Sequence, residues 1–234
     1  MVQIGKVFLH KPPYIALSIT DQESNDDILR HKISLLELRV DKFSRWDIPY
    51  VKDQMLNRQK TGIPLLLTVR CEQEEGGDGQ VSNAQKKDIF SQCAELADAV
   101  DVELSSPIRD ELIPIGKSHR KTVIVSSHNF LNTPDEEELE KILEDSLSAG
   151  ADIVKIACWA QTESDVQRLG RFTEQNRQKN LIAISLGETG AVSRVTFAEV
   201  GSLLTYSFIG QAMAPGQMPV ATLEERLKEH YPEF

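Results

Sequence analysis

Eight short apolar runs, rich in β-branched residues, alternate with longer polar segments along the chain and leave few folds open to it. The runs occupy residues 14–19, 35–40, 63–69, 99–104, 122–126, 153–157, 181–185 and 204–209. The polar segments carry apolar residues at helical spacing, in residues 23–32, 47–60, 83–96, 107–119, 134–149, 163–176, 191–200 and 222–228. Apolar strands joined by helices predict a parallel sheet that is covered on both faces. Eight such units in 234 residues favour one α/β domain, a closed (β/α)8 TIM barrel, over an open doubly wound sheet.

The two ends of this pattern carry further signals. Residues 1–11 precede the first unit, and we expect them to form a hairpin or strand that closes the bottom of the barrel. No linker or low-complexity tract divides the rest, so residues 1–234 are expected to form a single catalytic barrel domain. Thr133 and Pro134 precede a run of acidic residues, which predicts a helix with Thr133 as N-cap and Pro134 at its first position.

Composition excludes several classes of function. The chain has 26 Lys and Arg against 36 Asp and Glu, a formal net charge of −10, which argues against nucleic acid as a partner. No apolar run approaches the ~18 residues of a membrane span, and the first residues lack the apolar stretch of a signal peptide. We therefore expect a cytoplasmic protein that binds no membrane. Cys71, Cys93 and Cys158 fit neither a disulfide framework nor a zinc spacing, so we expect reduced core cysteines and no metal site.

Charged residues occur inside the apolar runs, where a barrel would not tolerate them unpaired. Strand alternation puts Glu37, Arg39 and Asp41 on one face of the second run, and the helices need the apolar residues of the other face. The charged face is therefore expected to point into the barrel. A structural ion-pair network explains this pattern as well as an active site does.

Lys155 is the most informative single residue, because it lies in a central strand between Val154 and Ile156. Burial disfavours the ammonium form, and a neutral amine can attack a ketone to form a Schiff base. A lysine that extends to solvent at a strand end is the alternative. His128 follows the fifth run and could transfer protons at neutral pH, although a helix cap or a loop contact would also explain it. Glu103, on the preceding strand, could orient that imidazole.

Three loop features suggest an anion site. Arg70 follows the third run, Arg194 follows a glycine in Gly190-Ala191-Val192-Ser193-Arg194, and Gln217 follows Pro215-Gly216. The planar guanidinium of arginine can bond both oxygens of a carboxylate. Each feature is weak alone, because surface arginines and glycine-rich loops are common.

Together these residues resemble the type I 3-dehydroquinate dehydratase family of the shikimate pathway, over about residues 14–217. The matching pieces are Glu37-Leu38-Arg39-Val40-Asp41, Thr68-Val69-Arg70 with Glu75-Gly76-Gly77, Asp101-Val102-Glu103-Leu104, Ser127-His128-Asn129-Phe130 with Thr133-Pro134, Ala151-Asp152-Ile153-Val154-Lys155-Ile156-Ala157, Thr189-Gly190 with Ser193-Arg194, and Ala214-Pro215-Gly216-Gln217. No piece is specific alone, but seven in order are. The resemblance implies a (β/α)8 barrel, no cofactor, and a homodimer that converts 3-dehydroquinate to 3-dehydroshikimate in aromatic amino acid biosynthesis.

The resemblance also implies a role for each matching residue. Lys155 would form an imine with the C3 ketone, and His128 would remove a proton from C2 and then protonate the departing C1 hydroxyl. Glu75, or Glu74, would assist the histidine, and Glu103 would support the site electrostatically. The remaining matches imply substrate contacts by Glu37, Arg39 and Arg70, a carboxylate clamp by Arg194 and a hydroxyl contact by Gln217.

One residue departs from the family pattern, and two other functions compete with this one. Met213 stands where family members often have a serine that contacts substrate. Another class I Schiff-base barrel of the aldolase type would also need Lys155, but no phosphate-binding glycine-rich loop follows the seventh run. A non-catalytic barrel that binds a carboxylate would need neither Lys155 nor His128.

Overall fold

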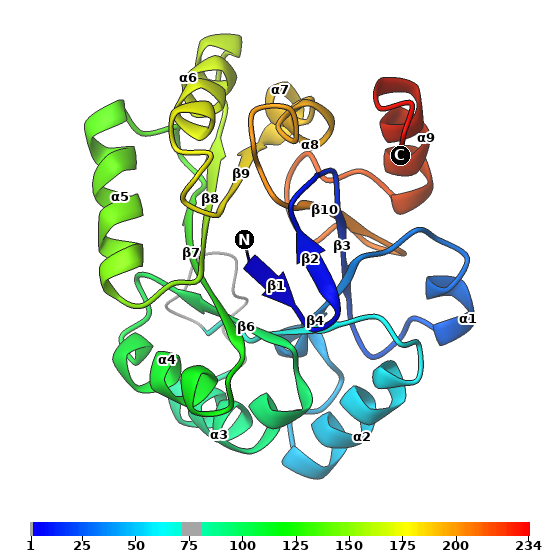
Figure 1. Ribbon diagram of the computed structural model, residues 1–234. Helices are drawn as coiled ribbons and strands as arrows, with labels where there is room; N and C mark the ends of the chain where they lie inside the picture. The colour runs from blue at the N-terminus through cyan, green and yellow to red at the C-terminus, as the bar shows by residue number, and fades with distance from the viewer. Residues whose placement is uncertain (1, 72–80) are drawn as a thin grey trace.

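A parallel eight-stranded sheet forms the centre of the computed structural model, which describes residues 2–71 and 81–234. Its strands follow one another around a ring in the order β10-β3-β4-β5-β6-β7-β8-β9, and each hydrogen-bonded pair is parallel (Figure 1). The strands are β3 (Ile15–Ile19), β4 (Leu35–Arg39), β5 (Leu65–Thr68), β6 (Ala99–Glu103), β7 (Thr122–Asn129), β8 (Ile153–Trp159), β9 (Leu181–Leu186) and β10 (Thr205–Phe208). The expected (β/α)8 barrel is confirmed.

The ring is nearly closed, with one seam between β9 and β10. Within residues 2–71 and 81–234 no strand ladder joins these two strands. At the amino-terminal end of the seam, the Leu203 N–H donates to the Leu181 carbonyl at 2.9 Å. Farther along, Arg194 donates to the Tyr206 carbonyl at 3.2 Å. These bonds hold the two sides of the seam together.

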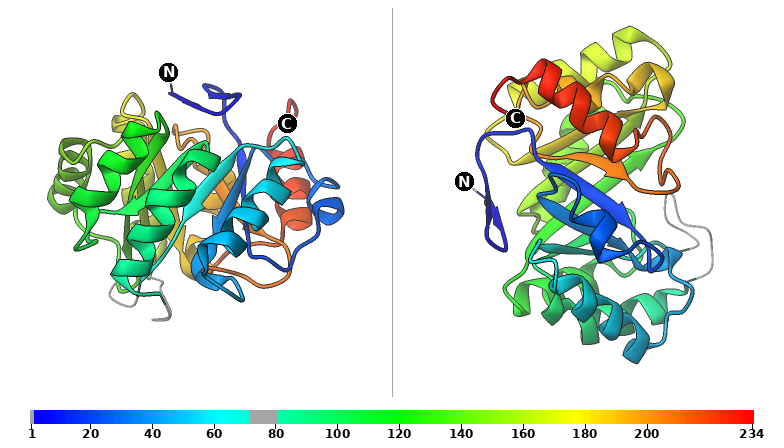
Figure 2. Two further views of the ribbon diagram at one scale, coloured as in Figure 1. Left: turned by 90° about the horizontal axis from the view of Figure 1, so that it is seen from below. Right: turned by 90° about the vertical axis from the view of Figure 1, so that its right-hand side faces the viewer.

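Helices form the outer layer and connect the strands (Figure 2). They are α1 (Asn25–Ile28), α2 (Ile48–Gln59), α3 (Asn83–Cys93), α4 (Arg109–Ser118), α5 (Glu136–Ser148), α6 (Glu163–Gln175), α7 (Gly187–Gly190), α8 (Ser193–Thr196) and α9 (Val220–His230). Short 3-10 turns cover Val40–Lys42 and Ala94–Leu96. In the described part of the chain, no helix has both the length and the apolar character that a bilayer crossing requires.

Two helix predictions were wrong in detail. The helix expected over residues 191–200 is shortened to α8, and the separate short helix α7 lies before the expected range. The Ser193 hydroxyl at the start of α8 donates to the Gly190 carbonyl and accepts from the Ser185 N–H at the end of β9. The N-cap of α5 is Asp135 rather than Thr133, because the Asp135 side chain accepts from the Glu138 N–H. The Thr133 hydroxyl donates to the Trp159 carbonyl instead.

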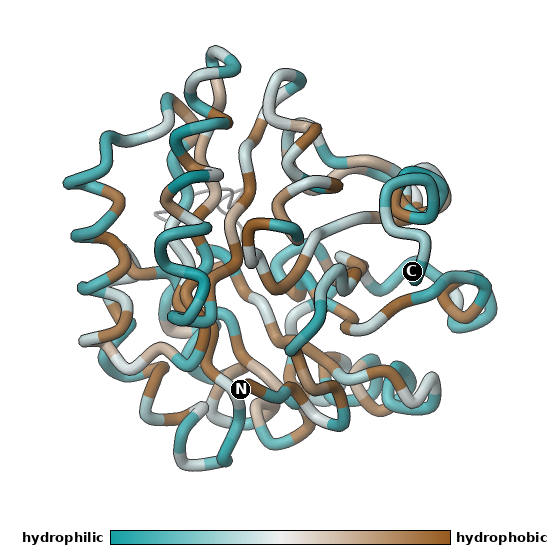
Figure 3. The backbone as a smooth tube through the Cα atoms, turned by 45° about the horizontal axis from the view of Figure 1, so that its top comes forward, coloured by the Kyte–Doolittle hydropathy of each residue, from teal (hydrophilic) through white to brown (hydrophobic). Residues whose placement is uncertain are grey.

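Strand alternation divides the apolar side chains between two regions. Outward-facing residues such as Leu36, Leu38 and Val102 pack against the helices. Inward-facing residues such as Leu35, Leu66 and Ile153 fill the amino-terminal half of the barrel. The outer helices correspondingly turn hydrophilic residues outward and hydrophobic residues toward the sheet (Figure 3).

The first residues form an antiparallel hairpin of β1 (Val2–Ile4) and β2 (Val7–Leu9). Ile4 and Leu9 are buried in the same cluster as the inward apolar residues at the starts of the strands. The Thr122 hydroxyl, at the start of β7, donates to the Gln3 carbonyl at 2.6 Å. The hairpin therefore covers the amino-terminal end of the barrel and leaves the opposite end for the polar residues.

Candidate active site

A pocket opens at the carboxyl-terminal ends of the strands, where (β/α)8 barrels carry their active sites. It encloses about 530 Å³, including its open mouth. Its polar and charged lining comes from seven of the residues predicted from sequence, together with Ser18 and Tyr206. The seven are Glu37, Arg39, Arg70, His128, Lys155, Arg194 and Gln217.

Lys155 points into this pocket from β8 and is only 5% exposed. Its Nζ lies 3.3 Å from Asp101 Oδ2 and 3.6 Å from Glu37 Oε1. The same nitrogen lies 4.2 Å from the centre of the Tyr206 ring. The amine is therefore held inside the barrel, and the alternative of a side chain that extends to solvent is wrong.

Glu37 is fixed from both neighbouring strands. Its carboxylate accepts hydrogen bonds from the Ser18 hydroxyl on β3 and from the Thr68 hydroxyl on β5, the latter at 3.2 Å. Arg39, one inward position farther along β4, forms a two-pronged pair with Asp41, at 3.0 and 2.7 Å. The charged face of β4 thus points inward, and its residues are paired as burial requires.

Arg70 and Asp101 form the other half of the buried network. Arg70 Nη2 lies 2.8 Å from Asp101 Oδ1, and its Nε lies 3.4 Å from Glu103 Oε1. The Ser126 hydroxyl donates to Asp101 Oδ1 at 2.6 Å. Burial by itself would raise the pKa of Asp101, but Arg70 and Lys155 outweigh it and hold the pKa well below its usual range. Asp101 is therefore ionised and bridges the guanidinium to the lysine.

His128 lies within β7, because this strand continues to Asn129 rather than ending at Ser126 as expected. Its Nδ1 lies 3.4 Å from Glu103 Oε1, and its ring stacks on Phe130 with 6.3 Å between the ring centres. Burial, followed by the positive charges of Arg70 and Lys155, lowers the pKa of His128 well below 6.5. The imidazole is therefore neutral at physiological pH and can accept a proton.

Arg194 and Gln217 organise the loop after β10. Arg194 donates to the carbonyls of Gly216 at 2.8 Å, Tyr206 at 3.2 Å and Pro215 at 3.3 Å, and burial lowers its pKa to about 10. Gln217 accepts from the Met213 N–H at 2.7 Å and donates to the Ser207 carbonyl at 3.3 Å. Met213 thus faces the pocket with a thioether and uses its backbone to hold Gln217.

Two acidic residues predicted for the site cannot be placed, and two residues of the site were not predicted from the sequence. Glu74 and Glu75 lie outside the described residues. Asp101 contacts Lys155 directly but was not among the predicted site residues, although its alternation with Glu103 on β6 was a usable signal. Tyr206 was missed because a tyrosine in an apolar strand gives no such signal.

The fold and this pocket define the class: a (β/α)8-barrel protein with a buried amine and a neutral imidazole at the carboxyl ends of its strands. A family model described as type I 3-dehydroquinase matches residues 15–232. The chain belongs to this family.

Known proteins that resemble the chain carry the same description. The 3-dehydroquinate dehydratase of Methanosarcina barkeri is 33% identical over 240 residues, which cover 97% of this chain and 99% of the relative. The 3-dehydroquinate dehydratase of Aquifex aeolicus is 34% identical over a match that covers 93% of this chain and 98% of the relative. The crystal structure of type I 3-dehydroquinate dehydratase from Clostridium difficile, with covalently modified comenic acid, matches 100% of this chain and 98% of its own with a TM-score of 0.89 and 27% identity.

Proposed function

We propose that this chain dehydrates 3-dehydroquinate to 3-dehydroshikimate through an imine on Lys155. The observation that carries the proposal is the buried amine of Lys155 in a pocket that it shares with the neutral imidazole of His128. The family supports the substrate, since the relatives are 3-dehydroquinate dehydratases. An aldolase-type reaction and a non-catalytic carboxylate site have no comparable support.

The chemistry needs an electron sink next to a base. Lys155 attacks the C3 ketone, and the resulting iminium acidifies the adjacent C2–H bond. His128 takes that proton, and the electron pair of the enamine expels the C1 hydroxyl, which leaves as water with the proton from His128. Hydrolysis of the imine releases the product and restores the amine.

The residues around Lys155 and His128 are proposed to have distinct roles in catalysis and in substrate binding. Glu103 Oε1 lies 3.4 Å from Nδ1 of the imidazole, and it is proposed to orient the ring so that the other nitrogen acts as the base. Glu37, Arg39, Arg70 and Gln217 line the pocket and are proposed to contact the substrate. Glu75 is proposed as the assisting acid. Arg194 is proposed as the carboxylate clamp. Its contacts with the carbonyls of Pro215 and Gly216 also anchor the loop that the substrate would touch.

Borohydride trapping tests the proposal directly. We expect the protein to convert 3-dehydroquinate to a product with enone absorbance, and borohydride to fix the substrate on Lys155, as peptide mass spectrometry would locate. Lys155→Ala should abolish both, but it also removes a positive charge beside Asp101 and Glu37. Lys155→Arg is therefore the matched variant, because it keeps the charge. Turnover or an adduct in folded Lys155→Arg would contradict the imine.

His128→Ala separates imine formation from proton transfer. We expect the variant to form the borohydride adduct with 3-dehydroquinate but to lose most of its turnover, because the base is absent. A folded variant that gives no adduct would contradict this division of roles.

The same proposal places the enzyme in the cytoplasm as a homodimer, and light scattering of the purified protein tests the dimer.

A further inference from the structure

Tyr206 carries a buried hydroxyl for which the structure provides no partner. The residue is 4% exposed, and among the described residues its Oη has no hydrogen-bond partner. Buried tyrosine hydroxyls normally have one, because an unmet donor inside a protein is costly. An unpaired hydroxyl at the centre of a pocket indicates that its hydrogen-bond partner is part of a bound ligand.

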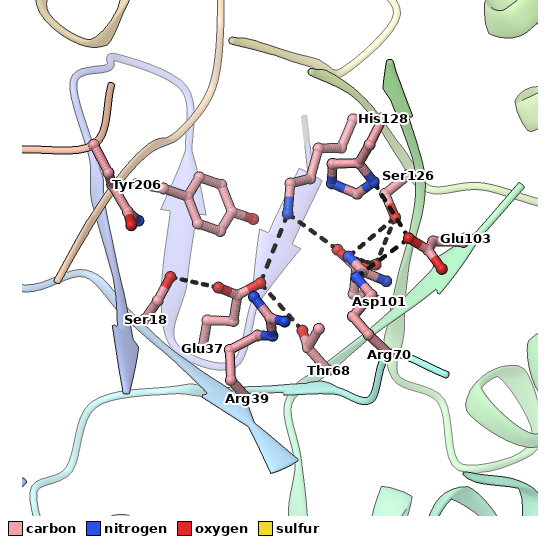
Figure 4. A network of polar contacts seen from close by, with 12 residues as sticks. Ser18, Glu37, Arg39, Thr68, Arg70, Asp101, Glu103, Ser126, His128 and Tyr206 are labelled. Carbon is pink, nitrogen blue, oxygen red and sulfur yellow. Dashed lines mark hydrogen bonds and ion pairs between the residues drawn. The ribbon is translucent and has the colours of Figure 1, made fainter. Parts of the chain in front are cut away.

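The ring of Tyr206 lies beside the reacting nitrogen of Lys155. The ring lies 4.2 Å from Lys155 Nζ, and its hydroxyl end points to the centre of the polar network (Figure 4). Burial, followed by the charges of Glu37 and Asp101, raises the pKa of Tyr206 well above 10. The group is therefore a neutral donor that keeps its proton at any working pH.

The other hydroxyl donors of this region are already used. Ser18 and Thr68 donate to Glu37, and Ser126 donates to Asp101. The carboxylates themselves only accept. Among the described hydroxyl groups that line this pocket or bond to its carboxylates, Tyr206 retains a proton to give to a substrate oxygen.

The strand order indicates which substrate oxygen this is. Lys155 projects from β8, His128 from β7 on one side of it, and Tyr206 from β10 on the other side. A ketone held at Nζ with its C2 toward His128 can turn its oxygen toward Tyr206. That oxygen gains negative charge as the C–N bond forms, so a donor placed there stabilises the transition state.

We propose that Tyr206 is a further catalytic residue, whose Oη donates a hydrogen bond to the ketone oxygen while Lys155 attacks, and holds that oxygen in the carbinolamine. The proposal rests on the proposed function. The C–N bond forms, the carbonyl electron pair moves to oxygen, and the C–O bond then breaks. A proton moves from the nitrogen to this oxygen, and a second proton from solvent lets the oxygen leave as water. In sum, the Lys155 amine, the ketone and one proton give the protonated imine and water, and Tyr206 neither loses nor gains a proton.

Tyr206→Phe tests this, because it removes only the hydroxyl and keeps the ring against Lys155. With saturating 3-dehydroquinate, rapid mixing with borohydride should show imine formation about tenfold slower, the loss expected for one hydrogen bond to a charged oxygen. The melting temperature of the ligand-free variant should be equal to or above that of the parent, since no bond is lost. Once formed, the imine should eliminate at the normal rate.

Tyr231→Phe is the matched control. The Tyr231 hydroxyl donates to the Val195 carbonyl at 2.8 Å, so its removal should lower the melting temperature and leave the trapping rate unchanged. An unchanged trapping rate in Tyr206→Phe overturns the inference, and so does a rise in KM alone or a lower melting temperature. A parent protein that forms neither adduct nor product overturns the proposed function, and this inference with it.

Discussion

His128 is an imidazole that its surroundings keep neutral, and its titration should therefore be visible in stability. Burial, Arg70 and Lys155 lower its pKa below 6.5 in the folded protein, whereas the unfolded chain restores the usual value. Below pH 6.5 the unfolded state binds a proton that the folded state does not, so its contribution to stability is complete above that pH and is lost on acidification.

We expect the free energy of unfolding to fall by about 1 kcal/mol per pH unit between pH 6.5 and the folded-state pKa on account of this one residue. Urea unfolding of the parent and of His128→Gln from pH 7 to pH 5 measures the contribution, and the variant should show the weaker dependence. His119→Gln, at an exposed position, is the control and should follow the parent. Equal slopes for the parent and His128→Gln would contradict the lowered pKa.

At the scale of elements, the loop after β10 depends on one close approach of two backbone segments. Gly216 has a φ of +73°, and a Cβ there would lie 2.2 Å from the Gly187 carbonyl oxygen at the start of α7. The same loop presents Gln217 to the pocket, and its carbonyls accept from Arg194. A side chain at Gly216 would therefore displace both the loop and the site.

Gly216→Ala should lower the free energy of unfolding by more than roughly 2 kcal/mol and also reduce kcat/KM. Gly210→Ala separates the two causes, because Gly210 has a φ of +82° but, among the described residues, a Cβ there would come within 4 Å only of Glu23 Oε1, at 3.8 Å. The control should lose about 1 kcal/mol from the left-handed backbone alone. Urea unfolding measures the stability of both variants, and steady-state kinetics measures their kcat/KM. Equal losses of stability in Gly216→Ala and Gly210→Ala would mean that the backbone near Gly187 moves away from the new Cβ at little cost in free energy.

The same elements show how far sequence periodicity reaches. Alternation along one strand predicted the inward face of Glu37 and Arg39, because each residue of a strand reverses the side-chain direction. It did not predict that Asp101 is the partner of Lys155, because that depends on the register of β6, β7 and β8. The unpartnered hydroxyl of Tyr206 depends on all neighbouring strands at once, and Asp135 replaced Thr133 as N-cap because Trp159 engages the threonine.

At the scale of the whole molecule, the barrel separates stability from chemistry along its axis. The hairpin and the apolar residues at the starts of the strands close one end, while the paired charges and the pocket occupy the other. In barrels of this kind, residues at the amino-terminal face serve stability and those at the carboxyl-terminal face serve catalysis. A change in the hairpin should therefore affect folding without affecting turnover.

Ile4→Ala tests this separation. Ile4 is 1% exposed, and its loss should leave a cavity under the barrel and lower the free energy of unfolding by about 2–4 kcal/mol. Phe8→Ala is the control in the same hairpin, since Phe8 is 51% exposed and its removal should cost about 0.5 kcal/mol or less. Urea unfolding measures the stability of each variant, and kcat, measured where all are folded, should equal that of the parent. A lower kcat in Ile4→Ala would mean that the hairpin affects Lys155 through the inward-facing apolar residues, such as Ile153, that lie between them.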